Sequence, residues 1–231
     1  MTKTTELLHP VHDVNKGCFD SYSRKRIDIL HPTEDMICIE DIANALSNIS
    51  RFGGHTKPGY NVAQHSLLVA AIAPSHLKKA ALLHDAAEAY LGDVIKPLKV
   101  LLGSRYAAME AEFEEVIFSK FGVSIVDLEA IKQYDKWALE VEHDHFFKGG
   151  SRLNIAVNEL FGGIVDTIWD AELSEKTFLK TFQRIWSAVE IANIKQLPQH
   201  IEVTAREMAA DPEGLVDTYN HDIYLSDEVS N

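Results

Sequence analysis

The chain has 231 residues, of which 46% are hydrophobic and 25% are charged. This length and balance are typical of a single globular domain with a sizeable core. They exclude a mostly disordered chain, a collagen-like repeat and a disulfide-dense mini-protein. The formal net charge of −13 disfavours binding to nucleic acid polymers and to anionic membranes, because both would be repelled.

The cysteine content and the N-terminal residues bear on location. The chain has two cysteines, Cys18 and Cys38, and its N-terminal residues lack the apolar core of a secretory signal. No apolar run approaches the roughly 18 residues that a membrane-spanning helix needs. We therefore expect a reduced, cytoplasmic protein.

Residues 1–38 form an N-terminal segment with one predicted element. The run from Cys18 to Leu30 has aromatic and β-branched residues on either side of the polar stretch Ser23–Arg24–Lys25. This pattern favours a small β-hairpin. Pro32 then breaks the chain.

Residues 39–148 are predicted to form a helical core. In its first helix Ile39, Ile42, Leu46 and Ile49 recur at three- and four-residue steps, so they share one face. Capping and helix-breaking residues bound the helices that follow. These are predicted over about 61–73, 76–91, 104–121 and 125–145.

A linker at Gly149–Gly150 precedes a predicted C-terminal helical extension, residues 149–210, which we expect to pack on the core. Ser174 is the predicted cap of its last strong helix. The stripe of Phe178, Phe182 and Trp186 on that helix is more typical of core than of a base-stacking surface.

Residues 211–231 carry several acidic residues and no Lys or Arg, which predicts a solvated acidic tail. Helical patterns dominate the rest of the chain. The predicted fold class is therefore all-α, with one small N-terminal β-hairpin.

Polar residues stand where the apolar pattern predicts core. His84 and Asp85 interrupt a run of Ala and Leu in the helix predicted over 76–91. An unpaired carboxylate buried there would cost several kcal/mol of desolvation, and a divalent cation is the simplest partner that removes this cost. Glu88 follows at helical spacing and can lean toward the same side.

Two further polar residues would complete a ligand set. His65 is polar within an apolar helix, and Asp135 lies on the helix predicted over 125–145. A hydrogen-bonded core histidine and a surface aspartate are the alternative interpretations. Imidazole with carboxylate suits Mn, Fe, Co, Ni or Zn better than Ca or Mg. We therefore predict one divalent transition metal, held by His65, His84, Asp85 and Asp135.

This ordered set resembles the H…HD…D signature of the HD-domain metal-dependent phosphohydrolases. With Arg51–Phe52, NVAQHS and HDAAEAYLGDVIKPLK, the chain resembles the HD-domain 5′-deoxynucleotidases of bacteria over about residues 40–142, and it is similar to HD phosphohydrolases of phages. The resemblance implies a helical bundle that holds one divalent metal, in a homodimer or a larger homo-oligomer. The related enzymes commonly carry Trp where Phe52 stands, and residues 150–210 have no clear counterpart in the short deoxynucleotidases.

Site roles follow from chemistry and from the resemblance together. Hydrolysis of a phosphate ester needs a positioned water, an acid or base, and positive charge near the phosphoryl oxygens. Glu88 and Asp93 are the candidate catalytic acid and base. Arg51 is expected to bind the phosphate with its planar donor fork, and Lys99 to add positive charge. The resemblance implies that Phe52 lies against the sugar or base.

The leading expectation is an enzyme, a 5′-deoxynucleotidase that converts a deoxynucleoside monophosphate to deoxynucleoside and phosphate. One alternative is a dATPase-like dNTP triphosphohydrolase, which would release tripolyphosphate. A catalytically silent HD module that binds nucleotides is the alternative from another class. The presence of Arg51, Glu88 and Asp93 argues against it, because a silent module could lose them freely.

Overall fold

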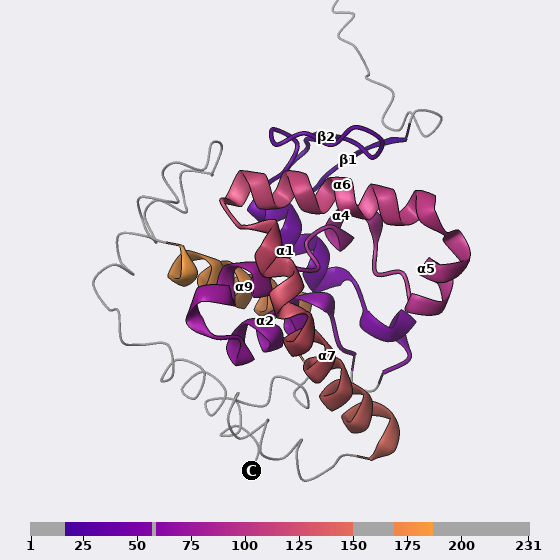
Figure 1. Ribbon diagram of the computed structural model, residues 1–231, viewed down its shortest axis with the longest axis vertical. Coiled ribbons are helices and arrows are strands. Elements are labelled where there is room, and N and C mark those ends of the chain that lie inside the picture. Colours follow the sequence, from indigo (N-terminus) through magenta and orange to yellow (C-terminus); the bar gives the residue numbers. More distant parts are fainter. Residues whose placement is uncertain (1–16, 57–58, 150–168, 187–231) are drawn as a thin grey trace, which may run out of the picture.

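The computed structural model describes residues 17–56, 59–149 and 169–186. It confirms the predicted all-α fold with a small antiparallel hairpin (Figure 1). In the hairpin, β1 (Cys18–Asp20) pairs with β2 (Arg26–Asp28). The acidic tail 211–231 and most of the extension 149–210 lie outside the described residues.

The helices follow the hairpin in chain order, with 3₁₀ turns at η2 (Arg51–Gly54) and η3 (Ser75–Leu77). They are α1 (Ile39–Asn48), α2 (Val62–Ile72), α3 (Lys78–Leu83), α4 (Glu88–Leu91), α5 (Lys96–Leu102), α6 (Ser104–Phe121), α7 (Ile125–Lys148) and α9 (Ala171–Ile185). The bounds of α1, α2 and α6 agree with prediction to within a residue. α7 runs to Lys148 rather than 145 and ends at Gly149, whose φ of 83° is left-handed.

The buried centre of the fold is α2. It has no polar face turned to solvent and is buried along most of its length, because α1, α3, α7 and α9 all pack against it. Its polar residues Gln64, His65 and Ser66 are fully buried with it. A polar side chain on α2 must therefore find its partners on the surrounding helices rather than in water.

The helix predicted over 76–91 is wrong as a continuous helix. α3 ends at Leu83, and a turn over 84–87 separates it from α4, with Ala86 N–H donating to the carbonyl of Leu83 (3.0 Å). The reason is a competing hydrogen bond. The His84 Nδ1 atom lies 2.7 Å from the carbonyl of Ala81, which in a continuous helix would accept from Asp85 N–H.

The predicted cap of the last helix is also wrong. α9 begins at Ala171, and its cap is Asp170, whose side chain accepts from Leu173 N–H (2.7 Å). Ser174 lies inside the helix and is fully buried.

The stripe of Phe178, Phe182 and Trp186 is buried in the core, as predicted. α9 places it against α1, α2 and α3.

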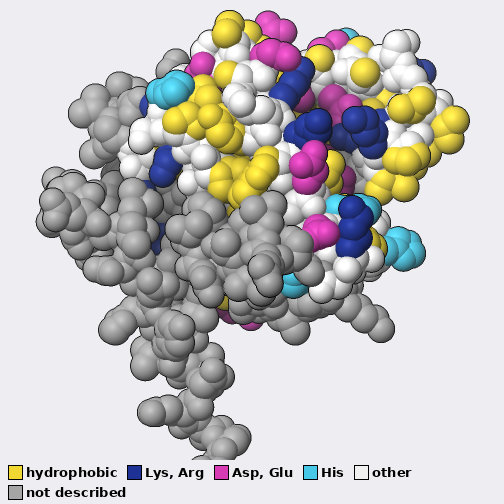
Figure 2. Space-filling model, turned by 60° about the horizontal axis from the view of Figure 1, so that its bottom comes forward, with side chains coloured by type: hydrophobic (Ala, Val, Ile, Leu, Met, Phe, Trp, Pro, Cys, Tyr) yellow, Lys and Arg dark blue, Asp and Glu magenta, His cyan; other side chains and the backbone are white. Residues whose placement is uncertain are grey.

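The short helix α5 was not predicted. It begins next to Pro97 and lies at one end of the molecule, where Figure 2 shows hydrophobic side chains gathered beside intermingled acidic and basic ones. The exposed large apolar residues at α5 are Ile95, Leu98, Val100, Leu101 and Leu102. No helix in the described part of the chain is long and apolar enough to cross a membrane.

Asn61 ties α9 to the start of α2. Its side chain accepts from Gln64 N–H (2.9 Å) as the N-cap, and its amide nitrogen donates to Ser174 Oγ (2.8 Å). We expect Asn61→Ala to lower the free energy of unfolding by about 2 kcal/mol, because a lost cap costs about 1 kcal/mol and a buried hydroxyl loses its partner too. Urea denaturation measures the change. Asn48→Ala is the control, since Asn48 is exposed and bonds within its own helix; equal losses would contradict the prediction.

Candidate metal centre

Three separate parts of the fold bring His65, His84 and Asp135 together. His65 lies in α2, His84 follows α3, and Asp135 lies on α7. His65 Nε2 is 3.2 Å from His84 Nε2 and 3.0 Å from Asp135 Oδ1. One ligand atom from each residue lies within 4.8 Å of the others, a spacing that could hold a metal ion.

Asp85 lies beside these three residues. Its Oδ2 atom is 3.3 Å from His84 Nε2 and 3.5 Å from His65 Nε2. The structure therefore brings together the four residues that the sequence predicted as ligands. Two imidazoles with two carboxylates are a donor set that fits a divalent transition metal.

The tautomers of the two histidines can be read from their other ring nitrogens. His84 Nδ1 faces the carbonyl of Ala81 (2.7 Å) and His65 Nδ1 faces a carboxylate oxygen of Glu142 (2.6 Å). A carbonyl and a carboxylate only accept, so both Nδ1 atoms carry the proton. In the neutral rings both Nε2 atoms then present lone pairs to each other at 3.2 Å. Such a pair needs a shared proton or a cation between them.

The surrounding charges keep the carboxylates ionised. Burial by itself opposes the charge of Asp85 and Asp135, but the adjacent imidazoles hold the pKa of both carboxyls well below its usual range. Burial likewise opposes the charge of His84, yet Asp85 and Asp135 hold the pKa of this imidazole well above its usual range. The centre therefore favours bound positive charge, either a proton or a metal ion.

Glu88 lies next to this centre with an unusual carboxyl group. It is 7% exposed, and its buried Oε2 atom has no hydrogen-bond partner among the described residues. Burial and the neighbouring carboxylates of Asp85 and Asp93 raise the pKa of Glu88 to about 9. A carboxyl group that keeps its proton near neutral pH can serve as a general acid or base beside the centre.

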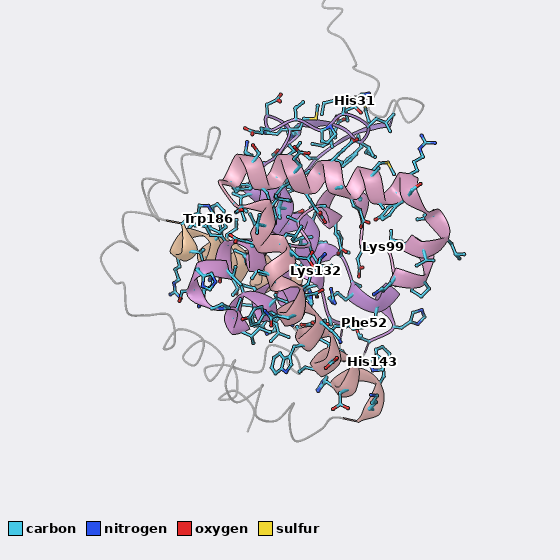
Figure 3. The ribbon with its side chains drawn as sticks, viewed as in Figure 1. His31, Phe52, Lys99, Lys132, His143 and Trp186 are labelled. Carbon is cyan, nitrogen blue, oxygen red and sulfur yellow. The ribbon has the colours of Figure 1, made fainter. Side chains whose placement is uncertain are left out.

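Lys99 and Asp93 border Glu88. The Lys99 ammonium on α5 is 2.7 Å from Glu110 Oε1 on α6 and 3.4 Å from Glu88 Oε1 (Figure 3). Its charge is thus already paired with the carboxylate of Glu110, which weakens its expected role toward a phosphate. Asp93 is half-buried in the loop after α4, and this burial raises its pKa.

Arg51 enters the site from η2 and is buried, with 9% exposed. A backbone hydrogen bond fixes the position of this residue, because Arg51 N–H donates to the carbonyl of Tyr60 (2.9 Å). Its Nη1 atom is 3.4 Å from Asp85 Oδ2 and its Nη2 atom 3.1 Å from Glu142 Oε2. The buried Nε has no hydrogen-bond partner in the described part of the chain. These contacts use two of the five N–H donors of the guanidinium, so donors are left for a ligand.

Phe52 has a strained backbone. Its φ of 54° is left-handed, a conformation that costs roughly 1–2 kcal/mol for a residue with a Cβ. The ring lies 5.5 Å from the Arg51 guanidinium and packs edge-on against Phe146 and Phe147 near the end of α7 (Figure 3). The structure thus places Phe52 at the border of the site, beside the arginine.

Sequence reasoning missed Glu142 and Tyr60. Glu142 is fully buried on α7 and accepts from Tyr60 OH (3.0 Å), His65 and Arg51. One signal was available, because Glu142 lies seven residues after Asp135 and so on the same face of the helix.

The chain is similar to curated proteins from two bacteria. It is 43% identical over 109 residues to the uncharacterized protein YfdR of Escherichia coli. The matched residues are 47% of this chain and 61% of that protein. It is 38% identical over 125 residues to an uncharacterized protein of Rhodobacter capsulatus. This match takes in 50% of this chain and 64% of that protein. The chain therefore spans about three fifths of the length of these curated relatives. No protein-family model matches the chain.

We expect Glu88 to lower stability in the metal-free protein as the pH rises. With a pKa of about 9 in the folded state against the ordinary value of 4.5, the folded state binds the proton more tightly, so the free energy of unfolding falls as the pH rises from the lower to the higher of these values. Glu88→Gln removes this loss and should be more stable than wild type by about 3 kcal/mol at pH 7.

Denaturation with a chelator present, repeated from pH 5 to pH 9, measures this difference. The advantage of Glu88→Gln should grow with pH. Glu140→Gln, an exposed site on α7, should show no such trend. An advantage of Glu88→Gln that stayed constant with pH would show that the carboxyl group titrates normally.

Proposed function

We propose that this protein is an HD-domain metal-dependent phosphohydrolase that acts on deoxynucleotides, with deoxynucleoside monophosphates as the leading substrates. The observation that carries the proposal is the meeting of the two imidazole Nε2 atoms at 3.2 Å, with Asp85 and Asp135 beside them. The resemblance of the sequence to HD-domain 5′-deoxynucleotidases supports the substrate class. The resemblance also indicates the type of reaction, phosphate ester hydrolysis, which the two imidazoles and two carboxylates alone do not specify.

The proposed roles follow the contacts. His65, His84, Asp85 and Asp135 would hold the metal, which when bound supplies a water of lowered pKa and positive charge for the phosphoryl oxygens. The guanidinium of Arg51 has N–H donors beyond those that hold its two carboxylate partners, and these would bind a phosphoryl oxygen. Glu88 can hold a proton and pass it on beside the centre.

Inorganic products identify the reaction. Deoxynucleoside mono-, di- and triphosphates, each incubated with Mn²⁺, Co²⁺, Ni²⁺ or Zn²⁺ and resolved by chromatography, test the proposal directly. Orthophosphate from a monophosphate supports a 5′-deoxynucleotidase, and tripolyphosphate would identify a dNTP triphosphohydrolase instead. Binding without turnover on the whole panel would identify a silent nucleotide-binding module. The homo-oligomer implied by the resemblance is likewise a proposal, which the molecular mass in solution tests.

We expect His84→Ala to lose metal and activity together, because removal of one imidazole from a four-ligand site weakens metal binding strongly. Metal content after dialysis, measured by mass spectrometry, and turnover on the best substrate follow the two losses. His143→Ala is the matched control, since His143 is an exposed imidazole on α7. Full metal content in His84→Ala would remove His84 from the ligand set.

We expect Arg51→Lys to lower kcat/KM by roughly 10- to 100-fold while the metal content stays unchanged. Lysine keeps the charge but offers no planar fork that could hold Asp85 and Glu142 and still bind a phosphoryl oxygen, a loss on the scale of about 1.5–3 kcal/mol. Arg105→Lys, at an exposed arginine on α6, controls for the substitution itself. Activity within twofold of wild type would show that Arg51 does not recognise the phosphate.

A further inference from the structure

A single buried carboxylate joins the two halves of the candidate site. Glu142 on α7 is fully buried. Its Oε1 atom accepts from His65 Nδ1 (2.6 Å) and Tyr60 OH (3.0 Å), and its Oε2 atom accepts from Arg51 Nη2 (3.1 Å). One of these partners is a candidate metal ligand and another is the candidate phosphate-binding residue.

We propose that Glu142 is a positioning residue that sets the orientation of His65 and of Arg51 at once, so that metal binding and phosphate recognition depend on the same side chain. The inference rests on the proposed function, because it gives Glu142 a role only if His65 binds a metal and Arg51 a phosphate. Glu142 would act through His65 and Arg51 and would not itself bind the metal or the phosphate.

The hydrogen bond to His65 has a specific consequence for the metal. Because the carboxylate accepts from Nδ1, the proton stays on that nitrogen and the lone pair of Nε2 faces His84 and Asp135. A carboxylate in this position also makes the imidazole a more basic ligand.

The bond to Arg51 has a matching consequence for the substrate. Glu142 holds Nη2 and Asp85 holds Nη1, so the long side chain is fixed before a ligand arrives and its remaining N–H groups are left as donors. Fixing a flexible side chain in advance lowers the entropy that binding costs.

A buried ion pair without a positioning role is the competing explanation. A carboxylate that only neutralised Arg51 would need no contact with an imidazole, yet the distance from His65 Nδ1 is the shorter of the two, at 2.6 Å against 3.1 Å. The competing explanation predicts that loss of Glu142 lowers the stability of the fold and leaves the metal affinity and catalysis of the folded protein unchanged. Positioning predicts that both change.

Glu142→Gln separates the two explanations. Glutamine keeps the shape but replaces one acceptor oxygen with a donor, which must face the donor of either His65 or Arg51. We expect the Co²⁺ affinity to fall by about 10- to 100-fold, the scale for loss of a partner behind a metal ligand. With Co²⁺ saturating, kcat/KM should still be at least about tenfold lower, because the single acceptor oxygen of glutamine cannot hold Arg51 and His65 together as the carboxylate does. Glu140→Gln, with an exposed carboxylate on the same helix, should match wild type in both.

Titration calorimetry with Co²⁺ gives the affinities without reference to activity, and kinetics at saturating Co²⁺ give the second quantity. If Glu142→Gln lies within twofold of wild type in both, the inference is overturned while the proposed function stands. If wild type binds neither Co²⁺ nor Mn²⁺, the proposed function itself fails and the inference falls with it.

A second variant decides the case in which Glu142→Gln does not fold. Tyr60→Phe removes a single hydrogen bond from the carboxylate and keeps the buried ring. A Co²⁺ affinity at least about threefold weaker than that of wild type, in the range of one lost hydrogen bond, supports positioning. An unchanged affinity in a folded Tyr60→Phe protein overturns it.

Discussion

The structure depends on the constraint that α2 is buried on all sides and still carries an imidazole. His65 is fully buried, so its ring nitrogens must find their partners inside the fold. Glu142 satisfies Nδ1 and Asp135 faces Nε2, and both belong to α7. Asp135 and Glu142 lie two helical turns apart on α7. They can reach opposite ring nitrogens of His65 at once only when α7 packs against α2 with His65 between them. The need to satisfy one buried ring thereby places the long helix.

The balance of charge around this ring favours a cation. Arg51 and Lys99 are the basic side chains that contact the carboxylates of the site in the described part of the chain. The carboxylates outnumber them: Asp85, Glu88, Asp93, Asp135 and Glu142. Burial and the neighbouring carboxylates raise the pKa of Glu88, and the carboxylates of Asp85 and Asp135 raise the pKa of His84 against the effect of its burial. A divalent ion at the same place would offset the negative charge without protonating the ligands.

Sequence patterns predicted most of the frame and the groups nearest the centre, for physical reasons that also mark their limit. The spacing of hydrophobic residues and the capping residues predicted the helices α2 and α6. Polar residues within apolar runs identified His65 and His84 as candidate ligands. The break after Leu83 was missed because it comes from the His84 side chain competing for a backbone carbonyl, which periodicity does not record. Glu142 was missed because Glu140 looks equivalent in the sequence, and only packing buries one and leaves the other exposed.

Several groups that cost stability border the candidate centre. Phe52 has a left-handed backbone, Glu88 has a buried oxygen without a partner in the described part of the chain, and two imidazole nitrogens face each other. Each lies on η2, on α2 or in the segment around α4, and each borders the same centre. The frame that carries them, from α1 to α9, is well packed and has buried aromatic contacts such as Phe182 on Trp186. Unfavourable groups that border one centre, beside a carboxylate as fully hydrogen-bonded as Glu142, are expected of a binding or catalytic site more than of a structural core.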